Sequence, residues 1–225
     1  MHRNPFIRLV RNIRARIGRW PDSFLWDVDG ALHIGANTGQ ERHMYANMGL
    51  VVVWVEPIPE VFNQLSLNLQ NYPNQHAVKA LVSSLDGESI LLNVASNNGE
   101  SSSILAPGHH LESWPEVKFG QQIQLNSISL STLVRENCSH LPNRSALILD
   151  TQGSELMILQ GGSEMISRFQ YVKVEAPDFE AYVGCPTASE IIDFMAKVGF
   201  VLKGKFLGAE SVIGKGKYFD LVFSR

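Results

Sequence analysis

The chain has 225 residues, of which 44% are hydrophobic, and a net charge of −3 at pH 7. A chain of this length can bury one sizeable core, and its near-neutral charge gives no electrostatic case for binding nucleic acid. No segment has the roughly 20 apolar residues that cross a bilayer, and Cys138 and Cys185 lack metal-ligand spacing, so we expect free thiols in a cytoplasmic protein.

The first 21 residues differ from the rest in charge. Residues 1–21 contain six arginines and no acidic side chain, which leaves a net charge of −9 for residues 22–225. Apolar side chains such as Phe6, Leu9 and Ile13 recur at helical spacing, so the segment is predicted to form a basic amphipathic helix before the main domain. We expect this helix to pack on the domain; the alternative is a weak contact with an anionic membrane surface or a polyanion.

A glycine turn follows the first predicted strand. The apolar run 30–34 leads into Gly35-Ala36-Asn37-Thr38-Gly39-Gln40, and a helix is predicted over 40–48. Gly35 permits a sharp turn, and Gly39 permits close packing of the helix. Free N–H groups at the start of this helix can face a carboxylate or a phosphate. Taken alone, the two-glycine pattern also fits an ordinary strand-to-helix turn.

The next predicted strand ends in a carboxylate. Residues 51–55 are apolar and lead into Glu56-Pro57, about 20 residues after the glycine turn, where an acidic residue accepts hydrogen bonds from ribose hydroxyls. The turn carries Asn37 in place of the middle glycine of the dinucleotide pattern G-x-G-x-x-G, which favours S-adenosylmethionine (SAM) over a pyrophosphate cofactor. The sequence therefore predicts an adenosine site for SAM, with a nicotinamide-dependent oxidoreductase as a weaker alternative.

Further along, short apolar runs alternate with helical patterns, which indicates βαβ units and a parallel sheet. Residues 96–122 are polar and show no period, so we expect a loop that acts as a lid over the methyl-acceptor site. Asp150 and Glu175 each follow an apolar run and should lie at the carboxyl edge of the sheet. The predicted elements after Glu56 are a helix from Pro59, a strand at 76–82 that ends near the adenine ring, a strand at 89–94, an apolar alternation over 123–130, a strand at 146–149, a helix from 153 that stops at Gly161, a strand at 171–174, a helix at 189–198, and a hairpin of strands at 200–207 and 217–224.

Four ordered blocks resemble one protein family. The segments HIGANTGQE (33–41), WVEPIPEVFNQLSLNL (54–69), LILDTQGSELMILQGG (147–162) and YVKVEA (171–176) are similar to the FkbM-type SAM-dependent methyltransferases. The resemblance implies a Rossmann-like α/β fold, with a mostly parallel seven-stranded sheet in the order 3-2-1-4-5-7-6 and an antiparallel C-terminal hairpin. It also implies methyl transfer from SAM to hydroxyl oxygens, often of sugars or secondary metabolites, and places the serine run 101–103 in the lid region.

Methyl transfer to a hydroxyl group is helped by a base that takes the proton. The catalytic candidates are Asp150, Glu175, His109 and His110. Asp150 leads, either as the base or as a partner for the ammonium group of SAM, and a helix N-cap is its purely structural alternative. The residues expected to contact the cofactor are His33, Gly35, Ala36, Asn37, Gly39, Gln40, Glu56, Pro57, Leu81, Ser103 and Asp150.

Two positions depart from the family pattern. Gln152 replaces the acid of the commoner D-V-E-G motif, which removes a carboxylate that a hard cation would need, so we expect no metal. A site made of Asp150, Glu155 and Glu175 is an alternative, but Glu155 is expected to stabilise the start of its helix instead. His33 stands where the family often has Asp.

The overall prediction is an O-methyltransferase that acts on a small-molecule or glycan acceptor, whose pocket is formed by residues 96–122 and 178–186. The departures at His33 and Gln152 keep one alternative open, a SAM-binding domain without turnover that docks a partner. The methyl acceptor itself and the oligomeric state cannot be read from the sequence.

Overall fold

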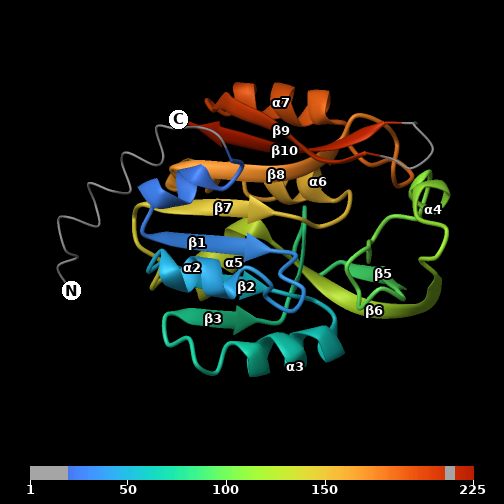
Figure 1. The fold of residues 1–225 in the computed structure, drawn as a ribbon, viewed down its shortest axis with the longest axis horizontal. Helices are drawn as coiled ribbons and strands as arrows, with labels where there is room; N and C mark the ends of the chain where they lie inside the picture. Colours follow the sequence, from blue (N-terminus) through green and yellow to red (C-terminus); the bar gives the residue numbers. More distant parts are fainter. Residues whose placement is uncertain (1–19, 211–215) are drawn as a thin grey trace.

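A sheet of seven strands forms the middle layer of the fold (Figure 1). The structure is a computed structural model that describes residues 20–210 and 216–225. The amphipathic helix predicted over 1–21 therefore lies outside the described residues, apart from its last two positions. In sheet order the strands are β3 (Gln75–Val78), β2 (Val51–Val55), β1 (Gly30–Ile34), β7 (Ser145–Leu149), β8 (Tyr171–Pro177), β10 (Lys217–Ser224) and β9 (Val201–Glu210).

The directions of the strands agree with the predicted arrangement. Neighbouring strands are parallel except for β10, which runs antiparallel to both β8 and β9. The predicted order 3-2-1-4-5-7-6, with its C-terminal hairpin, is confirmed. The predicted strand over 171–174 is too short, because β8 continues to Pro177 and pairs Glu175 with Asp220 of β10.

The central strands are buried from end to end. Every residue of β1 and β7 is buried, as expected of continuous apolar runs covered on both faces. Ile34 of β1 lies opposite Val55 of β2 and Leu149 of β7, so the three strands end at one level. The residues that follow them in the chain are thereby brought to the same edge of the sheet.

Helices cover both faces of this sheet. The larger apolar cluster packs one face against α5 (Leu130–Asn137), α6 (Glu155–Gln160), η2 (Ile166–Arg168) and α7 (Ala188–Lys197). The opposite face packs against η1 (Ser23–Asp27), α2 (Arg42–Asn47) and α3 (Pro59–Asn68). A capping box between Thr187 and Glu190 fixes the start of α7, whose Ile191 and Met195 are buried. Within the described ranges, no helix is long and apolar enough to cross a bilayer.

A second, three-stranded sheet corrects two predictions. The run 76–82 is not one strand: after β3 the chain leaves the main sheet, and β4 (Leu81–Ser83) pairs with β6 (Phe119–Ser129), which also pairs with β5 (Ser89–Ala95). Lys79 interrupts the run between the two strands, but one polar residue does not by itself reveal a change of pairing partner. The loop predicted over 96–122 contains α4 (His110–Ser113) and the first residues of β6, which are mostly exposed and so lack apolar alternation.

The second sheet lies where the main sheet ends. Figure 1 places β5, β6 and α4 beyond the arrowheads of β1 and β7, at the carboxyl edge of the parallel strands. Ligands of open α/β sheets bind in the crevice at this edge. The segment between β5 and β6 therefore stands over the region where a ligand would bind.

Candidate active site

Two adjoining cavities lie between the carboxyl edge of the sheet and the segment over it. The first contains about 540 Å³ of empty space, counting space open to solvent, and the second about 1320 Å³ with a wider opening. Both are lined by Gly35, Asn37, Asp150 and Gln152, from the turns that follow β1 and β7. The turns after these two strands thus stand at the junction of the cavities.

The turn after β1 depends on two glycines for different reasons. Gly35 has φ +84°, and a Cβ built on it would lie 1.7 Å from the Asp150 carbonyl oxygen. The backbones that follow β1 and β7 are therefore in direct contact at this point. Gly39 has φ +72°, and its Cβ would lie 2.8 Å from Leu65 Cδ1 of α3. Gly39 serves helix packing and lines neither cavity, whereas Ala36 and Gln40 line the second.

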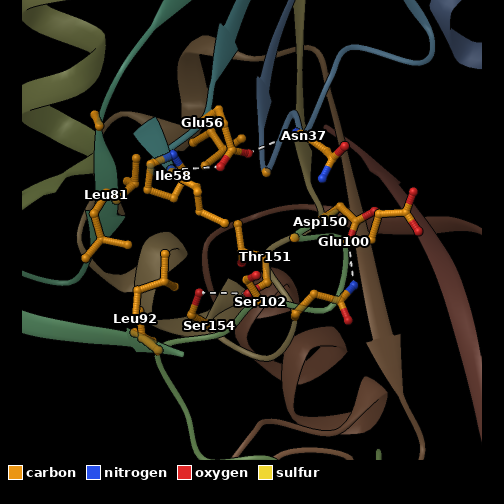
Figure 2. Close-up of a pocket in the computed structure, with 18 residues that line it drawn as sticks. Asn37, Glu56, Ile58, Leu81, Leu92, Glu100, Ser102, Asp150, Thr151 and Ser154 are labelled. Atoms are coloured by element: carbon orange, nitrogen blue, oxygen red, sulfur yellow. Dashed lines mark hydrogen bonds between the residues drawn. The ribbon is translucent and has the colours of Figure 1, made fainter. Parts of the chain in front are cut away.

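Glu56 is the buried carboxylate of the first cavity. The Asn37 N–H donates to Glu56 Oε2 at 3.0 Å, and the Ile58 N–H donates to Oε1 at 2.9 Å. Burial raises the pKa of Glu56 to about 7, although these two hydrogen bonds lower it. Figure 2 shows dashed lines from Glu56 to Asn37 and Ile58. The side chain is held rigidly at the end of β2, and each oxygen keeps a lone pair for a further donor.

Apolar side chains form another part of the first cavity. Ile58, Leu81 and Leu92 are buried and line it. In Figure 2, Leu81 and Leu92 lie on one side and Asp150 and Glu100 on the other. The cavity thus combines a flat apolar wall with a carboxylate at the end of β2, which suits a ring joined to a diol. Pro57 also lines it.

Gln152 joins the two candidate carboxylates, and sequence reasoning did not assign it this role. Its Nε2 donates to Asp150 Oδ1 at 2.9 Å and to Glu175 Oε2 at 3.0 Å, and its Oε1 accepts from the Tyr182 hydroxyl at 3.0 Å. The Tyr182 hydroxyl shares its one proton between Gln152 Oε1 and the Ser101 carbonyl. Because a carboxylate only accepts hydrogen bonds, the Asp150 contact requires the amide nitrogen to face the carboxylates. Gln152 has φ +57°, and its carbonyl accepts from the Ser103 hydroxyl at 2.7 Å.

The two carboxylates differ in exposure. Asp150 is exposed and lines both cavities, whereas Glu175 lines only the second. The nearby negative charge of Asp150, together with burial, raises the pKa of Glu175 well above its usual value. These surroundings favour the protonated form of Glu175. Asp150 does not cap α6, since that helix begins at Glu155 after Ser154.

Glu155 stabilises the turn that carries Asp150 and Gln152. It is fully buried, and its Oε1 accepts from the Thr151 N–H at 2.8 Å, while its Oε2 accepts from the Gly153 N–H at 3.0 Å. Burial raises its pKa to about 7. Its expected structural role at the start of α6 is confirmed. No group of three His, Cys, Asp or Glu side chains among the described residues has a metal-binding arrangement; that the protein needs no metal stays a prediction.

His33 lines the second cavity as a neutral imidazole. It is buried, its Nδ1 lies 3.1 Å from the Tyr45 hydroxyl oxygen, and its ring stacks on Trp54 at 5.0 Å between centroids. Burial lowers its pKa to about 4. His33 cannot supply the negative charge that the family often has at this position.

The two lid histidines have different surroundings. His109 pairs with Glu112 at 3.0 Å on the surface and lines neither cavity. His110 is buried, lines the second cavity, and stacks on Trp114 and Tyr182 at 4.8 and 5.0 Å between centroids. Its Nδ1 lies 3.4 Å from the Tyr218 hydroxyl oxygen, and its Nε2 has no hydrogen-bond partner among the residues that the structure describes.

The other expected site residues are placed as follows. Ser103 lines neither cavity, because its buried hydroxyl supports the turn at Gln152, while Ser102 lines the first cavity and Ser101 the second. Both cysteines are free and buried, as expected. Tyr182, Tyr218 and Trp114 are the residues that sequence reasoning missed. The only signal for Tyr182 was its place in the loop 178–186, which was expected to shape the pocket.

The family model described as "Methyltransferase FkbM domain" matches residues 33–202, more than half of the chain. The chain belongs to the FkbM methyltransferase family. The resemblance inferred from four sequence blocks is thereby confirmed. A search of curated protein sequences found no match.

Solved structures show the same fold for this FkbM methyltransferase. It is similar to magnesium protoporphyrin IX methyltransferase (ChlM) from Synechocystis PCC 6803 with bound SAM, at TM-score 0.51 and 10% identity, over 96% of this chain and 79% of that chain. The 1,6-didemethyltoxoflavin-N1-methyltransferase from Burkholderia thailandensis, with bound S-adenosylhomocysteine, matches at TM-score 0.48 and 11% identity, over 97% of this chain and 77% of that chain. At such identities the first likeness shows the SAM-dependent methyltransferase fold and nothing finer.

Proposed function

We propose that this protein is a SAM-dependent O-methyltransferase that acts on a hydroxyl group of a sugar, glycan or secondary-metabolite acceptor. The observation that carries the proposal is the first cavity, where a buried carboxylate held by two N–H groups faces an apolar wall next to a glycine turn. The residues present fit an adenosine group. Glu56 would accept hydrogen bonds from the ribose hydroxyls, and Ile58, Leu81 and Leu92 would pack against the adenine ring.

SAM, when bound, would supply a methyl group on a positively charged sulfur, and the acceptor oxygen would bond to the methyl carbon in line as the carbon–sulfur bond breaks and S-adenosylhomocysteine leaves. The contribution of this chain is mainly to hold the acceptor oxygen in position, and then to receive its proton. Asp150 suits the second task, because it lies at the junction of the two cavities, whereas the surroundings of Glu175 favour its protonated form. Gln152 holds the Asp150 carboxylate in place through Oδ1.

The test is transfer of a labelled methyl group from SAM to a panel of sugars, glycolipids and macrolides, with mass spectrometry of the products. S-adenosylhomocysteine binding is measured by calorimetry on the same preparations. We expect both binding and transfer. Binding without transfer to any member of the panel would favour the alternative of a non-catalytic SAM-binding domain, and binding of NAD instead would overturn the cofactor assignment.

Two isosteric variants assign the base. Asp150→Asn should bind S-adenosylhomocysteine within about twofold of the wild type and lower turnover by roughly 100-fold, the usual size of a general-base contribution. Glu175→Gln should lower turnover much less, because the raised pKa of Glu175 favours the form that already carries a proton. If Asp150→Asn loses cofactor binding, Asp150 instead holds the ammonium group of SAM.

Three further expectations remain predictions: the cytoplasmic location, the separate helix at 1–21, and the contact of that helix with a membrane or a polyanion.

A further inference from the structure

The second cavity has carboxylates but no Lys or Arg among the described residues that line it. Its acidic lining residues are Glu41, Glu100, Glu116, Asp150 and Glu175. The pKa values of its two histidines, His33 and His110, are lowered by burial, so both are neutral at pH 7. A negatively charged group entering this cavity would meet like charges and no described cation to balance them.

Carboxylates also have a defined hydrogen-bonding character. An ionised carboxylate only accepts hydrogen bonds, so a wall of carboxylates suits a ligand that presents many O–H or N–H donors. An ionised phosphate or carboxylate group presents no hydrogen-bond donor to these carboxylates. SAM carries one net positive charge when bound, which balances only part of this wall.

His110 gives an independent sign that a ligand is bound here. Its side chain is only 4% exposed, and its Nε2 makes no hydrogen bond within the described protein. A buried polar atom without a partner costs free energy unless a ligand or water satisfies it. The ring is held by stacking between Trp114 and Tyr182, so the position of Nε2 is fixed. A hydroxyl group of the ligand can pair with Nε2 in either tautomer.

We infer that the methyl acceptor is a hydroxyl-rich ring that is uncharged or cationic in the part that enters the second cavity, with His110 binding one of its hydroxyl groups. The inference rests on the proposed function, since it assigns the second cavity to the methyl acceptor. It excludes phosphorylated sugars, nucleotides and uronic acids as the group beside Asp150. Glu100 and Glu116, which are both exposed, set this selectivity at the rim.

The experiment uses four hexose probes that differ in charge: methyl glucoside, glucosamine, glucuronic acid and glucose 6-phosphate. Binding of each to the protein saturated with S-adenosylhomocysteine is measured by ligand-detected saturation-transfer NMR. Methyl glucoside and glucosamine should bind, and the two anions should bind at least about tenfold more weakly because of like-charge contacts. Equal or tighter binding of the anions would overturn the inference, and so would the absence of binding by all four probes.

Variants locate the bound ring. His110→Phe keeps the stacked ring but removes both nitrogens, and it should weaken methyl glucoside binding roughly threefold to tenfold, the value of one hydrogen bond. The double variant Glu100→Gln with Glu116→Gln should narrow the difference between glucuronic acid and methyl glucoside. The control is Glu112→Gln, which alters an exposed carboxylate on α4 that lines neither cavity.

Binding that is unchanged in both His110→Phe and the double variant would place the ring elsewhere and overturn the inference. S-adenosylhomocysteine affinity is measured for every sample and reports whether the variant is folded. Failure of the proposed function shows differently: the wild type would then not bind S-adenosylhomocysteine, or would bind it without methyl transfer to any acceptor, whatever the sugar probes do.

Discussion

The two cavities share a boundary but are built in different ways. The first combines the turns that directly follow β1 and β2 with an apolar wall that includes Leu81 and Leu92, and its carboxylate is held by a contact between Asn37 and Glu56, 19 residues apart. The second is assembled from segments far apart in the chain, as in the contact between Tyr182 and the Ser101 carbonyl, 81 residues apart. The main cause of the raised pKa also differs: it is burial for Glu56 and the charge of Asp150 for Glu175. A local motif therefore places the carboxylate of the first cavity, whereas tertiary packing brings together its apolar wall and the whole of the second cavity.

The largest expected effect concerns the backbone contact that both cavities share. Gly35→Ala should lower the free energy of unfolding by roughly 4 kcal/mol or more. The new Cβ would overlap the Asp150 carbonyl, and the alanine backbone would be strained at the positive φ of this position. Urea unfolding measures this change. The matched control is Gly87→Ala, which has a similar φ of +77° but no atom within 4 Å of the new Cβ; it should cost about 1 kcal/mol from the left-handed backbone alone. Equal costs in the two variants would show that the close approach is not rigid.

Removal of the bridge in the second cavity should have the next largest effect. Gln152→Leu leaves the Asp150 and Glu175 carboxyl groups without their shared donor, and each hydrogen bond to a charged group contributes about 1.5 to 3 kcal/mol. We expect the free energy of unfolding to fall by about 2 to 3 kcal/mol, since Asp150 is exposed and water replaces part of the lost hydrogen bonding. Gln64→Leu, which removes an exposed amide on α3, should change it by less than about 0.5 kcal/mol. Equal changes in the free energy of unfolding for Gln152→Leu and Gln64→Leu would show that the contacts of Gln152 do not stabilise the protein.

The first cavity is tested by a change that leaves the second intact. Glu56→Ala should weaken S-adenosylhomocysteine binding by about 1.5 to 3 kcal/mol, the value of hydrogen bonds to a charged group. Calorimetry on wild type and variant gives this difference directly. Glu60→Ala, at an exposed position in the first turn of α3, is the control and should bind like the wild type. If Glu56→Ala also binds like the wild type, Glu56 does not contact the ribose.

The same contrast explains what could be predicted from the sequence. The turn at Gly35 and the place of Glu56 follow from apolar runs and spacing, because each depends on neighbouring residues, whereas the strand order followed from the family resemblance. The split of the run 76–82 was missed, since Lys79 between β3 and β4 does not by itself show that the pairing partner changes from β2 to β6. Gln152 was recognised only as a missing acid. Its role depends on Glu175 and Tyr182, which only the tertiary fold brings to it.

The pH dependence of cofactor binding tests the central claim, that Glu56 is the carboxylate that holds the ribose. Because its pKa is raised from 4.5 to about 7, protonated Glu56 favours the folded protein, and the stability that this gives is lost as pH rises from about 4.5 to 7. Ribose hydroxyls instead favour the ionised form, so cofactor binding should strengthen over the range in which Glu56 ionises.

The decisive measurement is calorimetry of S-adenosylhomocysteine binding at pH 6 and pH 8, for the wild type and Glu56→Gln. A pKa of about 7 makes the ionised fraction rise about tenfold between these values, so the wild-type affinity should rise by up to about tenfold more than that of the variant. Wild-type and Glu56→Gln affinities that are equal at both pH values would contradict the account.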